Sequence, residues 1–136
     1  MRRCGFLVLL LISMLVGCSA SEQATETISP PQSYYQISQD EAQKMMEQND
    51  GHVIVDVRRQ DEYDAGHIPG AVLIPNEDID AKPPAELPNL NQVILIYCRS
   101  GNRSKQAAQK LFDMGYTNIY EFGGINTWTG EIVAEG

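Results

Sequence analysis

Basic residues are scarce in this sequence of 136 residues, which has 10 lysines and arginines against 18 acidic residues and a net charge of −8. Such an acidic surface repels phosphate backbones and anionic headgroups, which excludes nucleic acid as an expected partner. Histidine is rarer still, with only His52 and His67, so no cluster of histidine and cysteine ligands can be assembled and we expect no metal site. An anionic substrate would need a local cluster of positive charge to overcome the repulsion from the negative net charge of the protein.

Cysteine occurs only three times, at Cys4, Cys18 and Cys98. Residues 1–17 begin with two arginines after the initial methionine, continue through a largely apolar run and end on small residues, which is typical of a secretory signal peptide rather than a membrane span. The tetrapeptide LVGC, residues 15–18, resembles the lipobox of bacterial lipoproteins. That resemblance implies cleavage before Cys18 and a lipid on its thiol. The alternative is an ordinary signal peptide cut near Ala20.

On the lipoprotein interpretation, residues 18–33 form a lipidated N-terminus and a flexible tether, because this segment is polar and lacks aromatic residues. Two or more acyl chains make a stable anchor. We therefore expect an extracytoplasmic protein anchored to a bacterial membrane, with plasma and outer membrane both open. Loss of Arg2 and Arg3 with the signal would lower the net charge to −10. Cys98 would then be the only free thiol, and no internal disulfide could form.

The remaining residues, 34–136, alternate between strand-like and helix-like segments, which predicts a single α/β domain with a mainly parallel sheet. Short apolar runs predict strands at residues 34–38, 52–58, 71–75, 92–98 and 118–122, with 92–98 as the central strand. Capping signals and apolar periodicity predict helices at 38–48 and 104–114, helical turns at 59–67 and a terminal turn after 123–124. The proline-rich segment 76–91 predicts a loop with one irregular helical turn.

The stretch "CRSGNRS", residues 98–104, is the strongest candidate for chemistry. Cys98 stands at the carboxyl end of the expected central strand, which is where ligands bind in α/β sheets. A loop that curls from this point into a helix can aim its N–H groups inward as an anion cradle. The loop also has a glycine for the bend, a serine suited to cap the helix and two positive charges: Gly101, Ser104, Arg99 and Arg103. We therefore predict a lowered Cys98 pKa and an activated nucleophile without a partner base, the alternative being an inert buried thiol.

Three segments together resemble the rhodanese, or thiosulfate sulfurtransferase, family: "CRSGNRS" at 98–104, "DVRRQDEYDAGHIPGA" at 56–71 and "GGINTW" at 123–128. They stand in the expected order across roughly residues 34–131, which is nearly the whole proposed domain. The resemblance implies an α/β rhodanese-like fold over residues 34–136, with a small, mainly parallel sheet flanked by helices on both faces.

The resemblance also implies a two-step reaction at Cys98. Its thiolate would attack the outer sulfur of thiosulfate or a related donor, sulfite would leave, and a thiophilic acceptor such as cyanide or a small thiol would remove sulfur from the resulting persulfide. The loop residues would surround the bound sulfur: Arg99, Ser100, Gly101, Asn102, Arg103 and Ser104. Arg99 or Arg103 would neutralise the sulfonate of the donor. No metal or organic cofactor is needed, and we expect a monomer, with a protein sulfur donor or acceptor left open.

Four residues of the segment at 56–71 are expected to support the structure rather than react: Asp56, Arg58, Glu62 and His67. We predict that Arg58 pairs with Glu62 across the helical turn. His67 is expected to hold its loop by hydrogen bonds, with roles as a general base or metal ligand much less favoured.

Two other functions remain as alternatives. A dual-specificity phosphatase or arsenate reductase on the same fold would place five residues between cysteine and arginine, whereas four separate Cys98 from Arg103 here. The shorter loop suits a single sulfur better than a tetrahedral oxyanion. The second alternative is a sulfur carrier or protein-binding module without turnover, which the retained cysteine and loop leave open.

Overall fold

The computed structural model describes Gly17 and residues 33–135. The predicted lipidation site, Cys18, and nearly all of the predicted signal peptide and tether lie outside the described residues. Within the described residues, no helix combines the length and the apolar character needed to cross a membrane.

A five-stranded sheet forms the centre of the domain, in the order β1-β5-β4-β2-β3 with every neighbouring pair parallel. The strands are β1 (Tyr35–Gln36), β2 (Val53–Asp56), β3 (Val72–Leu73), β4 (Val93–Cys98) and β5 (Asn118–Gly124). Parallel sheets need both faces covered, and their strands are correspondingly apolar. The predicted α/β class, the parallel sheet and the central position of residues 92–98 are confirmed.

Three α-helices and two single turns of 3₁₀ helix connect the strands: α1 (Gln39–Met46), α2 (Gln60–Ala65), α3 (Asn102–Asp113), η1 (Asn76–Asp78) and η2 (Ile125–Thr127). Helix α1 begins with the predicted capping box, in which Ser38 and Glu41 satisfy one another's backbone N–H groups. Turn η1 is the irregular helical turn expected in the proline-rich segment. Helix α3, however, begins two residues before the predicted start at Ser104.

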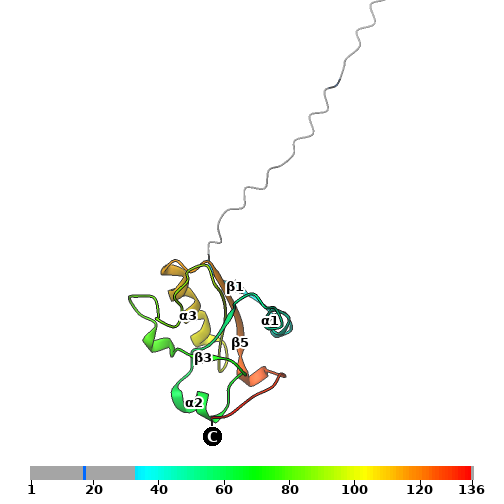
Figure 1. Ribbon diagram of the computed structural model, residues 1–136, viewed down its shortest axis with the longest axis vertical. Coiled ribbons are helices and arrows are strands. Elements are labelled where there is room, and N and C mark those ends of the chain that lie inside the picture. The colour runs from blue at the N-terminus through cyan, green and yellow to red at the C-terminus, as the bar shows by residue number, and fades with distance from the viewer. Residues whose placement is uncertain (1–16, 18–32, 136) are drawn as a thin grey trace, which may run out of the picture.

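Helices α1 and α3 lie on opposite faces of the sheet (Figure 1), as predicted. One apolar cluster packs Ala107, Ala108 and Leu111 of α3 against one face, and the second packs Ala42 of α1 against the other. Because successive side chains of a strand point to opposite faces, each cluster takes alternate residues of β4. At the end of β4, Tyr97 enters the α1 cluster and Cys98 enters the α3 cluster, and both are 0% exposed.

Candidate active site

Cys98 is the last residue of β4, and the next three residues turn the chain into helix α3. Gly101 is the residue before the helix and has φ of 103°, a left-handed conformation that residues with a Cβ atom seldom adopt. This conformation aims the Gly101 N–H at the Cys98 sulfur, with 2.9 Å between nitrogen and Sγ. The sulfur therefore lies buried inside the curl of the loop, as the sequence predicts.

Ser104 does not cap helix α3, and that prediction is wrong. The residue lies in the first turn of the helix and is fully buried, with its hydroxyl pointing back into the loop. Its Oγ is 3.0 Å from the Gly101 carbonyl oxygen and donates to Glu121 Oε1 of β5 at 2.6 Å. Ser104 therefore connects the loop to the neighbouring strand instead of ending the helix.

The end of β5 and the residues that follow it lie very close to the loop. A Cβ atom on Gly124 would collide with the carbonyl of Arg99, so only glycine fits at this approach. Two residues further on, the Asn126 N–H donates to the same carbonyl at 3.2 Å. The "GGINTW" segment, residues 123–128, therefore packs against the cysteine loop and holds the Arg99 carbonyl in place.

The pKa of the Cys98 thiol lies below its ordinary value, and the predicted direction is confirmed. Burial raises this pKa, but the combined hydrogen bonds to the sulfur from the Ser104 hydroxyl and from the N–H groups of Ser104, Gly101 and Ser100 outweigh burial. The loop amides thus act as the predicted cradle. We expected the two arginines to add to this effect. The positive charge of Arg103 does favour the Cys98 thiolate, although its guanidinium is paired with Glu62, whereas Arg99 is exposed.

Arg103 forms a two-pronged ion pair with Glu62 of α2, with distances of 2.7 Å and 2.9 Å between the guanidinium nitrogens and the carboxylate oxygens. The predicted pair between Arg58 and Glu62 is therefore wrong. Hydrogen bonds from Arg103 hold the pKa of Glu62 at about 2, against the partial burial that raises it. The pair connects α2 to the first turn of α3, beside the cysteine loop.

The Glu62–Arg103 pair should make the stability of the domain depend on acid pH. A carboxylate with a lowered folded-state pKa stabilises the fold fully above its unfolded value, here 4.5, and loses this contribution as pH falls toward about 2. We expect a coupling free energy on the order of 1 kcal/mol at pH 7, because both side chains are partly exposed. A double-mutant cycle with Glu62→Gln and Arg103→Gln, measured by urea unfolding, should give this coupling at pH 7 and almost none near pH 2. A coupling that stayed constant over this range would contradict the assignment.

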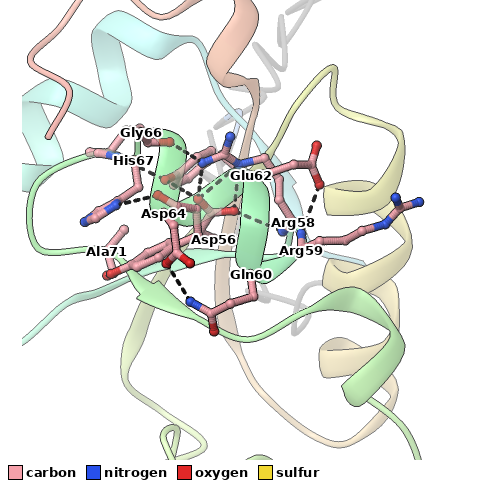
Figure 2. A network of polar contacts seen from close by, with 12 residues as sticks. Asp56, Arg58, Arg59, Gln60, Glu62, Asp64, Gly66, His67 and Ala71 are labelled. Atoms are coloured by element: carbon pink, nitrogen blue, oxygen red, sulfur yellow. Dashed lines mark hydrogen bonds and ion pairs between the residues drawn. The ribbon is translucent and has the colours of Figure 1, made fainter. Parts of the chain in front are cut away.

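Arg58 binds Asp56, and both side chains are buried (Figure 2). Arg58 donates to both carboxylate oxygens of Asp56, at distances from 2.7 to 3.1 Å, and to the carbonyl of Gly66 at 2.7 Å. The Tyr97 hydroxyl donates to Asp56 at 2.7 Å and accepts from the Ile68 N–H at 3.1 Å. This network fixes the ends of β2 and β4 and the loop after α2, and among the described residues no buried side-chain nitrogen or oxygen atom lacks a hydrogen-bond partner.

His67 holds its loop through hydrogen bonds and stacking. Its Nδ1 lies 2.9 Å from the Tyr63 carbonyl oxygen, and its ring stacks on that of Tyr63 with 3.7 Å between centroids. Its backbone exchanges two hydrogen bonds with Val133, which ties the C-terminal segment to the loop. His67 is 4% exposed and belongs to the framework around Asp56 (Figure 2), as expected from the sequence.

The sequence patterns did not predict the roles of two buried residues in this region, Tyr97 and Glu121. Tyr97 stands within an apolar strand, where only its hydroxyl hinted that it would need a polar partner such as Asp56. Glu121 occupies an inward-facing position of β5, two residues after the buried Ile119. An acidic residue at such a position in an apolar strand indicates a buried carboxylate with hydrogen-bond partners, so the sequence could have shown it. Among residues 33–135, no group of three or more histidine, cysteine, aspartate or glutamate side chains is arranged to hold a metal ion.

Comparisons with known proteins agree with this geometry. The model of the rhodanese-like domain family matches residues 38–131. The thiosulfate sulfurtransferase GlpE of Pseudomonas fluorescens is 35% identical over 103 residues, covering 75% of this chain and 91% of the relative. The adenylyltransferase and sulfurtransferase UBA4 of Meyerozyma guilliermondii is 35% identical over 92 residues, covering 62% of this chain but only 22% of that longer protein.

The crystal structure of a rhodanese-like domain protein from Staphylococcus aureus superposes with a TM-score of 0.63 at 30% identity, covering 75% of this chain and 99% of that one. The family model covers more than half of the chain and includes the cysteine loop, the Asp56 network and the glycine pair that braces the loop. The chain therefore belongs to the rhodanese family.

Proposed function

We propose that the protein is a sulfurtransferase of the thiosulfate:cyanide type, which carries a sulfane sulfur on Cys98 as a persulfide. The observation that carries the proposal is the Cys98 sulfur in its cradle of N–H groups, with a lowered pKa. Donors arranged in this way stabilise an anionic sulfur, in the thiolate and equally in the persulfide that follows it. The thiosulfate sulfurtransferase GlpE, which aligns with most of this chain, supports the same reaction class.

In the first step the Cys98 thiolate attacks the outer sulfur of thiosulfate. A new S–S bond forms, the bond between the two thiosulfate sulfurs breaks, and its electron pair leaves with sulfite. In the second step the acceptor attacks the outer sulfur of the persulfide and Cys98 leaves as the thiolate, so that cyanide becomes thiocyanate. Charge and atoms balance in each step without a cofactor.

Arg99 is better suited than Arg103 to meet the sulfonate of the donor. Glu62 engages both terminal nitrogens of the Arg103 guanidinium, whereas Arg99 is exposed at the loop and takes part in no ion pair among residues 33–135. The same engagement weakens the phosphatase alternative, because a phosphatase needs this arginine to bind the oxyanion. We therefore assign Arg103 mainly to holding the loop against α2.

A sulfur carrier without free turnover is the second candidate, and the complete burial of Cys98 favours it. A buried sulfur is protected from solvent, and a protein partner could deliver or remove sulfur at the loop. UBA4 is described as both an adenylyltransferase and a sulfurtransferase, so one relative combines this domain with a second activity. The physiological donor and acceptor could then be proteins rather than thiosulfate and cyanide.

One experiment separates these functions. The full chain is incubated with thiosulfate, the peptide containing Cys98 is weighed by mass spectrometry, and thiocyanate is measured after addition of cyanide. We expect one added sulfur on Cys98 and repeated turnover. An adduct without turnover would favour the carrier, and the absence of both would overturn both sulfur functions.

We also propose that the chain is a bacterial lipoprotein, with Cys18 as the lipidated residue and the domain facing outward from the cytoplasm. The support is the sequence pattern of residues 1–18, which lie almost entirely outside the described residues. Labelling of cells with a fatty-acid analogue should mark the protein and fail to mark the Cys18→Ala variant. Equal labelling of both would refute this localisation.

A further inference from the structure

A cavity of about 640 Å³ lies on the α1 side of the sheet, and the proposed reaction does not use it. Met46 of α1, Ile54 of β2, Ile68 and Trp128 line it, and all four belong to the α1 cluster. None of the described residues that line it belongs to the cysteine loop, residues 98–104. Small-molecule sites are mostly apolar clefts of about 300–1,000 Å³ with a few polar groups. The size and the apolar wall of this cavity therefore fit a small organic ligand.

The acidic residues at this cavity have no cationic partners. Glu47 and Glu131 line it from the end of α1 and from the C-terminal segment, and both residues are exposed. Neither carboxylate takes part in an ion pair among residues 33–135. The described residues that line the cavity include no lysine or arginine, and Lys44 in the last turn of α1 is not one of them. The cavity therefore has two carboxylates available to a ligand.

Helix α1 adds to the negative potential of the cavity. Glu47 is the C-cap residue of α1, and the carbonyl end of a helix carries a partial negative charge. A carboxylate at this end is unfavourable for the helix, and a cation bound beside it would relieve the repulsion. The cavity is also lined by His52, whose Nδ1 lies 2.6 Å from Asp50 Oδ1, so Asp50 balances the charge of the ring even when the ring is protonated. The electrostatics of the cavity thus favour a cation over an anion.

We propose that this cavity binds a small organic cation, namely an amine or guanidinium group joined to an apolar body. The apolar body packs against Met46 and Trp128, and the cationic group lies near Glu47 and Glu131. A second copy of the chain is a poor occupant, because two chains that each have a net charge of −8 repel each other. Thiosulfate is disfavoured for the same reason, so the cavity is not a second site for the proposed sulfur donor.

Three probes of similar shape and different charge test the proposal: 2-phenylethylamine, 2-phenylethanol and 3-phenylpropionate. Each is titrated into the full chain at low salt and pH 8, where a histidine side chain is ordinarily neutral. Trp128 is the only tryptophan and lines the cavity, so its fluorescence reports binding, and calorimetry repeats the measurement without an optical signal. We expect a dissociation constant on the order of 1 mM for the amine and at least about tenfold weaker binding of the carboxylate. Added salt should weaken the binding of the amine.

Two substitutions test the role of the carboxylates. Glu47→Gln and Glu131→Gln should each weaken amine binding by about threefold, and together by about tenfold, because each exposed carboxylate contributes a modest attraction. Trp128 donates to the backbone carbonyl of Glu131, so this hydrogen bond does not depend on the substituted side chain. The matched control Asp61→Asn/Glu86→Gln removes two charges from exposed residues that do not line the cavity, and it should leave the affinity within about twofold.

Met46→Lys places a positive charge in the wall of the cavity and should weaken amine binding by at least about tenfold. Equal affinity for the three probes, or amine affinity unchanged in Glu47→Gln/Glu131→Gln, would overturn the inference. The absence of saturable amine binding in both measurements would also overturn it. Thiocyanate production should stay at the native rate in the same double variant, because no residue of the cysteine loop lines the cavity. The binding of a cation and the transfer of sulfur are thus tested separately.

Discussion

Replacement of Cys98 by serine should reduce sulfur transfer by about a thousandfold or more, because a hydroxyl cannot form the persulfide on which both steps depend. The substitution removes the nucleophile while it keeps an acceptor for the Gly101 N–H, which now lies 2.9 Å from the sulfur. Thiocyanate production from thiosulfate and cyanide measures the effect. Mass spectrometry should find no sulfur adduct on the substituted peptide.

The unfolding free energy separates this loss from simple misfolding. Serine is smaller than cysteine but occupies the same buried position, so we expect a change in stability of about 1 kcal/mol. If a folded Cys98→Ser variant still produced thiocyanate at a tenth of the native rate, another group would have to be the nucleophile. Such a result would contradict the proposed function at its central residue.

Replacement of Asp56 by alanine should destabilise the domain by about 3–5 kcal/mol, because the buried Arg58 guanidinium would lose its counter-charge. The Tyr97 hydroxyl would lose its acceptor at the same time. Since a domain of this kind has only about 5–15 kcal/mol of total stability, the variant would unfold in much less denaturant. Urea unfolding followed by the fluorescence of the single tryptophan, Trp128, measures the loss.

Two comparisons sharpen the Asp56 prediction. Asp61→Ala removes an exposed carboxylate from α2 and should change stability by less than about 0.5 kcal/mol. The double variant Asp56→Ala/Arg58→Met should regain part of the loss, since an uncharged side chain no longer needs a buried partner. A cost below about 1 kcal/mol for Asp56→Ala would show that Arg58 finds solvent or another acceptor.

The features that could be predicted from the sequence are those that depend on neighbouring residues. The alternation of apolar runs with helix signals was enough to predict a parallel sheet with residues 92–98 at its centre. The spacing of Ser38 and its partner acid was enough to predict the capping box. The direction of the Cys98 pKa was also predictable, because the amides responsible belong to the same short loop. These features follow from the types and spacing of residues within a single short segment.

The two wrong predictions about side-chain partners concern residues that are distant along the chain. Ser104 looked like a helix cap, but its partner Glu121 lies 17 residues away on β5. Glu62 looked suited to Arg58, but the guanidinium it binds belongs to Arg103, 41 residues later. Such pairs form where the sheet brings strand ends together, and no local pattern specifies which of several acids meets which base.

The adjacency of Tyr97 and Cys98 at the end of β4 divides the tasks of the domain between its two faces. Tyr97 completes the rigid Asp56 network on the α1 side, while Cys98 opens the reactive loop on the α3 side. Substitutions in the Asp56 network should therefore change heat tolerance, and substitutions in the cysteine loop should change chemistry. The stability of the domain could therefore be increased through the Asp56 network without a change in the reactivity of Cys98, although Tyr97 and Cys98 are adjacent in the chain.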